Sequence, residues 1–178
     1  KVSAALNFVS ISGLTFRGAG IEATKILLKD GTNLGTSAGS GAVLNLNGVA
    51  FSRFQGFSIE GESGFGGTHA CNAGIQFWWG ASIGRSSTGV HFEDINITNL
   101  RFKKAGLLIG EDTRSGVQVD CSYYENVAVR GNWTDGENTY WQAAVRVGDG
   151  THGNNLLHDF RKLGTGTCKY LIHLLPTN

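Results

Sequence analysis

The sequence contains no methionine, a single proline and only three cysteines among its 178 residues. The cysteines are far apart and none belongs to a CxxC pair, so neither a disulfide framework nor a structural zinc site is indicated. No stretch approaches the roughly 20 consecutive apolar residues that a membrane-spanning helix needs. The chain has no signal peptide at its start. Because it contains no methionine and opens and ends without an obvious terminal element, it is predicted to be a processed product or a piece of a longer protein.

Charged residues are scarce too, at 16%, and the formal net charge is only +1. No basic run interleaved with aromatic residues is present, so a nucleic acid is not an expected partner. The chain is 40% hydrophobic, which argues against disorder and is enough for one domain with a core. Glycine, in contrast, is abundant, with 27 residues, and this indicates many turns.

An internal repeat is the main feature of the sequence. Its pattern places apolar residues at the first, fourth and sixth positions and a glycine or asparagine at the eighth, where a left-handed corner is expected. Five copies occur, at ISGLTFRG (11–18), FQGFSIEG (54–61), FEDINITN (92–99), YENVAVRG (124–131) and, more weakly, LHDFRKLG (157–164).

A second apolar pair with a period of two follows each copy, which is strand geometry. The pairs are Ile26/Leu28, Ile75/Phe77, Leu107/Ile109, Val145/Val147 and Ile172/Leu174, and a third strand is expected at 43–46 and 117–119. Stacked repeats of this kind predict an all-β fold, a right-handed parallel β-helix (solenoid) of about five coils with loops of variable length. A β-sandwich is the rival, but it does not explain one motif recurring in register.

The segment 14–26, LTFRGAGIEATKI, resembles the opening coils of pectate-lyase-like β-helix proteins. That family includes secreted polysaccharide lyases, glycoside hydrolases, epimerases and bacteriophage tailspikes. A Pro-x-Gly-x-Tyr element that usually precedes this coil is missing, so residues 1–178 are expected to be a single β-helix domain without its N-terminal cap. The resemblance implies a location outside the cell or on a virion, a polysaccharide partner, and sometimes a bound Ca²⁺ ion, although no metal-ligand spacing is visible here.

The first candidate site is a column formed by the second residue of each copy: Ser12, Gln55, Glu93, Glu125 and His158. Glu93 and Glu125 would be neighbours on adjacent coils. Two carboxylates about 5 Å apart suit glycoside hydrolysis, one as acid and one as nucleophile or base. The alternative is a pair of solvated surface glutamates.

The second candidate site lies just beyond the second strands, where Asp30, Trp79, Glu111 and Asp149 form a predicted column. Gly110 and Gly148 precede two of these residues and are expected to end the strand and change the direction of the side chains. Trp78 and Trp79 beside carboxylates would suit a sugar ring. The alternatives are tryptophans that fill the core and aspartates that close turns.

Further residues are candidates for the same site. Asp112 and Asp120 would add a third acid, and Arg114 or Lys104 would neutralise a uronate. The loop 132–141 is a third candidate, in which Trp133, Tyr140 and Trp141 accompany Asp135 and Glu137 and would line a glycan-binding wall. An aromatic cap that packs this loop onto its own coil is the equal alternative.

Two functions therefore compete. The first is a polysaccharide lyase or glycoside hydrolase with catalytic residues among Glu111, Asp149, Glu93, Glu125 and Asp120. The second is a non-catalytic module of tailspike or fibre type, forming a homotrimer, that binds a glycan or acts as a spacer. An open groove shared by Trp79 and the acids favours the enzyme, whereas buried tryptophans with acids on opposite faces favour the module.

Overall fold

The computed structural model shows an all-β chain and describes residues 1–35, 41–80, 83–84, 86–111, 118–135, 139–148 and 154–175. Within these ranges there is no α-helix, and a single 3₁₀ turn, η1, spans Gly64–Gly66. The strands are β1 (Leu6–Val9), β2 (Thr15–Arg17), β3 (Lys25–Leu28), β4 (Ala42–Asn47), β5 (Arg53–Gly61), β6 (Cys71–Trp78), β7 (Ser87–Thr88), β8 (His91–Ile97), β9 (Phe102–Ile109), β10 (Gln118–Arg130), β11 (Ala143–Val147), β12 (Asn154–Arg161), β13 (Gly164–Gly166) and β14 (Tyr170–Leu174).

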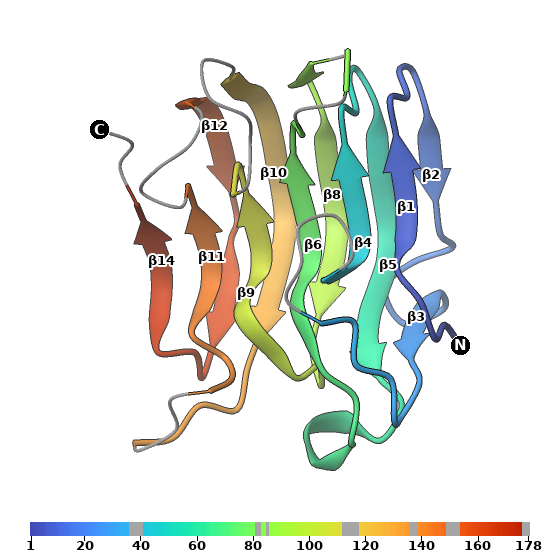
Figure 1. Ribbon diagram of the computed structural model, residues 1–178, viewed down its shortest axis with the longest axis vertical. Helices are drawn as coiled ribbons and strands as arrows, with labels where there is room; N and C mark the ends of the chain where they lie inside the picture. Colours follow the sequence, from blue (N-terminus) through green and yellow to red (C-terminus); the bar gives the residue numbers. More distant parts are fainter. Residues whose placement is uncertain are drawn as a thin grey trace.

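The strands form two parallel sheets. A six-stranded sheet has the order β1-β4-β6-β9-β11-β14, and an eight-stranded sheet has the order β12-β10-β8-β5-β2, with β3 beside β5 and with β7 and β13 beside β10. The chain alternates between the sheets, and each return adds a strand parallel to the previous one. In Figure 1 the strands of one sheet point up and those of the other point down, and the chain advances from one side of the molecule to the other.

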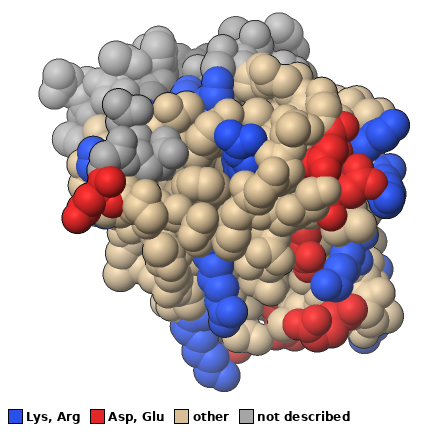
Figure 2. Space-filling model, turned by 90° about the horizontal axis from the view of Figure 1, so that it is seen from below, with Lys and Arg blue, Asp and Glu red and all other residues tan. Residues whose placement is uncertain are grey.

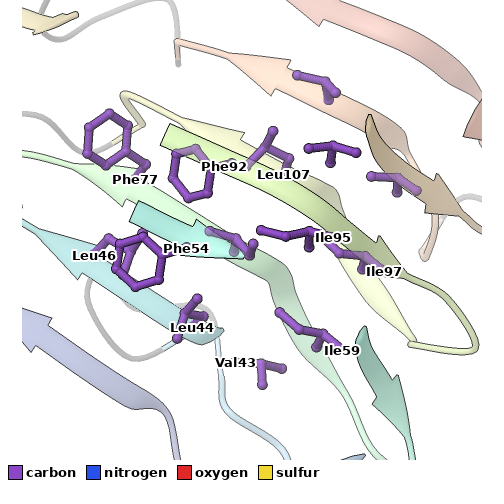
Figure 3. Packing of buried hydrophobic residues seen from close by; sticks show 14 of the residues in the cluster. Val43, Leu44, Leu46, Phe54, Ile59, Phe77, Phe92, Ile95, Ile97 and Leu107 are labelled. Carbon is purple, nitrogen blue, oxygen red and sulfur yellow. The ribbon is translucent and has the colours of Figure 1, made fainter. Parts of the chain in front are cut away.

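The core lies between the two sheets. Leu44, Leu46 and Phe77 from the six-stranded sheet meet Phe54 and Phe92 from the eight-stranded sheet, and all five side chains are fully buried. Figure 3 shows these side chains pointing into the space between the sheets. The β-branched and aromatic residues of the repeat thus form a continuous buried surface, as the sequence pattern predicts.

An aromatic stack runs through the core along the eight-stranded sheet. Phe16, Phe54, Phe92, Tyr124 and Phe160 follow one another on adjacent strands, with ring centroids 6.0, 5.7, 5.0 and 4.5 Å apart. Burial raises the pKa of the Tyr124 phenol well above its ordinary value. Since each ring packs on the next, this stack sets the register of the sheet.

The register confirms the three central copies of the repeat and corrects the outer two. Phe54, Phe92 and Tyr124 are aligned, as predicted from their positions in the motif. The first copy is shifted, because Phe16 and not Ile11 pairs with Phe54. The fifth is shifted as well, since Phe160 takes the place predicted for Leu157. In both copies the residue that pairs with its neighbour in the stack is aromatic. The sequence pattern did not distinguish aromatic from aliphatic residues, so it aligned these two copies incorrectly.

Neither the strand at 26–28 nor the strand at 43–46 lies in the row of strands predicted for it. Ile26 pairs with Ile59 in the eight-stranded sheet rather than beginning the other sheet. The segment 43–46, predicted as a third strand, belongs instead to the row of second strands, where Leu44 pairs with Ile75 and Leu46 with Phe77.

The residues that close each motif copy serve two different purposes. Asn99 has a φ of 55°, which confirms the predicted left-handed corner. Gly18, Gly61 and Gly131 do not have a positive φ, so the corner predicted there is wrong. A side chain at these glycines would collide with a neighbour, as at Gly18, where a Cβ would lie 2.1 Å from the carbonyl oxygen of Gly56.

Candidate functional site

The candidate site is a strip on the outer face of the eight-stranded sheet. The residues that alternate with the aromatic stack point outward and form two columns on β5, β8, β10 and β12. We call these eight residues the outer strip: Arg53, His91, Tyr123 and Asp159 in one column, and Gln55, Glu93, Glu125 and Arg161 in the other.

His91 lies at the centre of a hydrogen-bonded and ionic network in this strip. The Nη2 of Arg53 lies 3.1 Å from His91 Nδ1, and the Nε of Arg53 lies 3.9 Å from Glu93 Oε2. Because a guanidinium only donates, we assign His91 Nδ1 as the acceptor, which leaves the proton of the neutral ring on Nε2. That nitrogen faces Glu125 Oε2 at 3.8 Å, so His91 joins the Arg53–Glu93 pair to Glu125.

The far end of the strip holds a second ion pair. Both the Nε and the Nη2 of Arg161 contact Asp159 Oδ2, at 2.9 and 2.8 Å. The hydrogen bond to Asp159 raises the pKa of Arg161 above its ordinary value. The pair is exposed, so it orients Arg161 more than it stabilises the fold.

Hollows in the surface accompany the strip. One, of about 260 Å³, is lined by His91, Tyr123, Tyr124, Glu125 and Arg161. A second, of about 450 Å³, is lined by Cys121, Tyr123, Leu157, His158 and Asp159. A third, of about 430 Å³, lies at the N-terminal end between Arg17, Gly18–Gly20, Gln55, Gly56 and Asp94. Volumes of this size suit small polar units such as single sugar rings.

Glu93 and Glu125 are in register on adjacent strands, which confirms that they are neighbours. Parallel strands lie about 4.8 Å apart, so both carboxyl groups can flank one bond of a bound chain. Gln55 is in register with Glu93, as predicted, whereas the two ends of the predicted column are wrong. Arg17 and Arg161 take the places given to Ser12 and His158, because the first and fifth motif copies are shifted.

Asp120 and His158 lie near the strip but outside its two columns. Asp120 pairs with Thr88 on β7 and precedes the left-handed residue Cys121, so it is not aligned with the Glu93–Glu125 pair. His158 pairs with Ser122, and its ring packs 6.0 Å from Tyr124. Burial lowers the pKa of His158 to about 4.

Glu111 belongs to the other sheet, away from the Glu93–Glu125 pair. It follows Gly110, whose φ of 70° confirms that the strand ends there and that the side chain changes direction. Glu111 is only 2% exposed and forms ion pairs with Lys104 and with Arg146 Nε, the latter at 3.3 Å. Two cations neutralise this carboxylate, so Lys104 is committed to it and the geometry does not support a free catalytic acid.

Asp30 does not share a column with Glu111, because β3 lies in the eight-stranded sheet. Its carboxylate accepts hydrogen bonds from the Ser63 hydroxyl, from His69 Nδ1 at 3.1 Å and from the backbone N–H of Thr68 at 3.2 Å. The hydrogen bonds from Ser63 and His69 are the main causes that lower the pKa of Asp30. This aspartate therefore holds the segment 63–69 in place, rather than closing a turn of its own as the structural alternative predicted.

The two adjacent tryptophans are packed rather than open. Trp78 is 8% exposed, and its Nε1 donates to Asn45 Oδ1 at 2.7 Å. Trp79 packs against the core, and its Nε1 donates to the carbonyl of Ile83 at 2.8 Å. These contacts favour the alternative in which the tryptophans fill space. Asp149, Asp112 and Arg114, the other residues predicted for this site, lie outside the described residues.

The aromatic residues of loop 132–141 also pack onto the molecule. Trp141 is 7% exposed, and its Nε1 donates to the carbonyl of Leu100 at 2.8 Å. Arg101 lies over the Tyr140 ring, 4.4 Å from its centroid, and Trp133 packs against the core. Among the described residues, the loop therefore matches the predicted aromatic cap. Asp135 is described and exposed, while Glu137 lies outside the described ranges.

Sequence reasoning missed five residues of the strip: Arg53, His91, Tyr123, Asp159 and Arg161. The sequence did contain a signal for them, because each of the five residues is adjacent in sequence to an aromatic residue of the stack. Aligning the copies on their aromatic residues, rather than on the first apolar residue, would have placed all five in two columns.

Comparison with protein-family models, with curated proteins and with solved structures found no match. In the described part of the chain, no three His, Cys, Asp or Glu side chains are arranged to hold a metal ion. The Ca²⁺ ion implied by the resemblance stays a prediction, since calcium also accepts backbone carbonyl oxygens as ligands. Nor does any helix within the described ranges have the length and apolar character needed to cross a membrane.

Proposed function

We propose that the chain is a right-handed parallel β-helix of the pectate-lyase-like kind. Support comes from the alternation of strands between two parallel sheets and from the aromatic stack that links five successive repeats. Crossover connections between parallel strands are right-handed in nearly all proteins, which supports the hand. Residues from successive coils then form straight columns on the surface, as in the outer strip.

The function that the geometry supports best is binding and cleavage of an extended polysaccharide, outside the cell or on a virion, along the outer strip. One observation carries this proposal: Glu93 and Glu125 lie in register on adjacent strands, beside His91 and next to hollows of sugar-ring size. A fold alone licenses no activity, so the argument rests on these side chains.

Hydrolysis of a glycosidic bond is the reaction that this pair suits. One carboxyl group donates its proton to the leaving glycosidic oxygen. The other, ionised, either attacks the anomeric carbon or removes a proton from an attacking water. Glu93 lies beside the Arg53 guanidinium and Glu125 beside the His91 imidazole, so we assign Glu93 the role of nucleophile or base and Glu125 the role of general acid.

The test is a screen of the purified chain against diverse polysaccharides, with reducing ends and unsaturated uronate absorbance measured. We expect reducing ends from at least one polymer. Glu93→Gln and Glu125→Gln should each lower kcat by about 100-fold or more, while binding persists. Glu22→Gln, an exposed carboxylate outside the strip, is the matched control and should keep full activity. Activity retained in both strip variants would refute the catalytic assignment.

A non-catalytic glycan-binding module of tailspike type is the second candidate, and specific observations favour it. Trp78 is buried and Trp79 is partly buried against the core, and the acids Glu111 and Glu125 lie on different sheets. If a polymer binds to the strip without cleavage, this candidate replaces the enzyme, and sedimentation would test the predicted homotrimer.

A further inference from the structure

Tyr123 is the aromatic residue of the outer strip, and it separates two hollows. Its side chain is 47% exposed, and it lines both the hollow of about 260 Å³ and the hollow of about 450 Å³. The His91 ring packs against it almost at right angles, with centroids 6.0 Å apart. That contact holds the tyrosine in place without burying it.

The two hollows around Tyr123 carry little positive charge. Their described lining contains Glu125 and Asp159 as acids and Arg161 as the only guanidinium. Arg161 is already bound to Asp159 through two nitrogens. A carboxylated or sulfated ligand would therefore meet a net negative lining and would have to compete with Asp159 for Arg161.

The charges on one further face of the molecule are mixed as well. The face seen from below in Figure 2 carries basic and acidic side chains, which lie side by side in several places, and it shows no broad basic patch. At the other end of the strip, Arg53 is engaged by Glu93 and His91. A field that attracts a polyanion needs unpaired cations of one sign, and the strip does not provide them.

An exposed apolar side chain, Leu157, lines the larger of these two hollows, and a second, Phe51, is exposed elsewhere. Leu157 is 76% exposed and Phe51 is 70% exposed, and both have a left-handed φ, of 55° and 46°. Both lie in one corner column of left-handed residues, with Gly89 and Cys121 between them in the register. Bulky residues in this backbone region cost free energy, and such strain is often retained at functional sites.

We infer that the outer strip binds an uncharged sugar chain, with one ring stacked on Tyr123 and its neighbours in the two hollows. This inference rests on the proposed function and specifies its ligand class. The apolar face of a pyranose fits the phenol ring and the Leu157 side chain. Its hydroxyl groups donate to Glu125 and Asp159 and accept from Arg161, which are the hydrogen bonds that these paired charges can still form.

The test compares polymers that share a backbone and differ in charge. Binding to polygalacturonate and to its carboxyl-reduced form, and to carboxymethyl cellulose and hydroxyethyl cellulose, is measured by affinity electrophoresis and calorimetry. We expect a neutral member to bind more tightly than its acidic counterpart. Its affinity should change less than about twofold between about 0.05 and about 0.5 M NaCl, because no ion pair forms.

Variants locate the binding on the strip. Tyr123→Ala should weaken binding of the neutral polymer at least tenfold, while Tyr123→Phe should stay within about twofold, because stacking needs the ring and not the hydroxyl. Tyr170→Ala, on edge strand β14 of the other sheet, is the matched control and should bind like the parent chain. Circular dichroism of each variant shows whether it is folded.

The outcomes separate this inference from the proposed function. Tighter, salt-sensitive binding of the acidic polymers overturns the uncharged ligand but leaves a polysaccharide-binding strip intact. Unchanged binding by a folded Tyr123→Ala variant overturns the stacking. Failure of the chain to bind or cleave any polysaccharide overturns the proposed function, and the inference with it.

Discussion

Replacing Gly18 by alanine tests the corrected register of the first repeat. The φ of Gly18 is not in the left-handed region, so alanine suits the backbone conformation itself. In an open position such a change would stabilise the fold by about 0.4–1 kcal/mol, because alanine restricts the unfolded chain. The structure predicts the opposite sign, because of what surrounds the added methyl group.

The magnitude follows from three contacts. The new Cβ would lie 2.1 Å from the carbonyl oxygen of Gly56, 3.0 Å from its carbonyl carbon and 2.8 Å from Thr24 Cβ. Two of these atoms are backbone, and the same segments are joined by hydrogen bonds from Gly18 N to Gln55 O and from Gly20 N to Gly56 O, both 2.9 Å. Overpacking costs about 1–3 kcal/mol, and weakening both hydrogen bonds adds about 1–3 kcal/mol, so we expect a loss of about 2–6 kcal/mol in all.

The assay is equilibrium unfolding in urea, followed by tryptophan fluorescence, with Gly66→Ala as the matched control. Gly66 has no atom within 4 Å of an added Cβ and no positive φ, so its variant should be as stable as the parent chain or slightly more so. If Gly18→Ala unfolds at the same urea concentration as Gly66→Ala, the pairing of Phe16 with Phe54 is wrong.

Three further changes probe other parts of the structure. The folded chain holds the pKa of His158 at about 4, so the neutral imidazole contributes its full stabilisation above pH 6.5. As the pH falls toward 4, the free energy of unfolding should decrease by up to roughly 3 kcal/mol. In urea titrations over that range, the free energy of unfolding of His158→Gln should decrease less steeply with falling pH. Glu111→Gln should lower the free energy of unfolding by about 3 kcal/mol, since two basic neighbours lose their counter-charge, and an unchanged thermal midpoint would contradict this. Trp141→Phe should cost about 1–3 kcal/mol through the orphaned carbonyl of Leu100, measured by the same unfolding curves.

The sequence predicted the parts of the fold that depend on local pattern. Period-two apolar pairs and recurring motifs indicated parallel strands, and the three central copies were aligned correctly. The outer copies were misaligned because several apolar residues of similar size compete for each slot. Only the contact between rings, such as Phe160 on Tyr124 at 4.5 Å, selects one alignment, and that information is not local.

The sequence predicted only part of the candidate site, because the rest of the site also depends on the alignment of the outer copies. The neighbouring Glu93 and Glu125 followed from the central copies, whereas the flanking arginines depended on the outer ones. The burial of Trp78 depended on Asn45, a residue on another strand whose amide oxygen accepts its N–H. No spacing in the sequence reveals such a partner.

Register decides which chemistry the surface presents. Side chains alternate along a strand, so moving β12 by one residue relative to β10 would turn Asp159 and Arg161 inward and bring Phe160 to the surface. The aromatic stack prevents that shift, because it would expose one ring and leave Tyr124 without its neighbour. The same stack therefore holds the fold together and keeps the Asp159–Arg161 pair of β12 on the outer face, where it contributes to the charge balance around Tyr123. If the strip binds a glycan as proposed, Phe160 would influence the choice of ligand through this register, without lining either hollow. Phe160→Leu is expected to preserve the sheet but loosen this register, and to reduce the discrimination between neutral and acidic polymers before it abolishes binding.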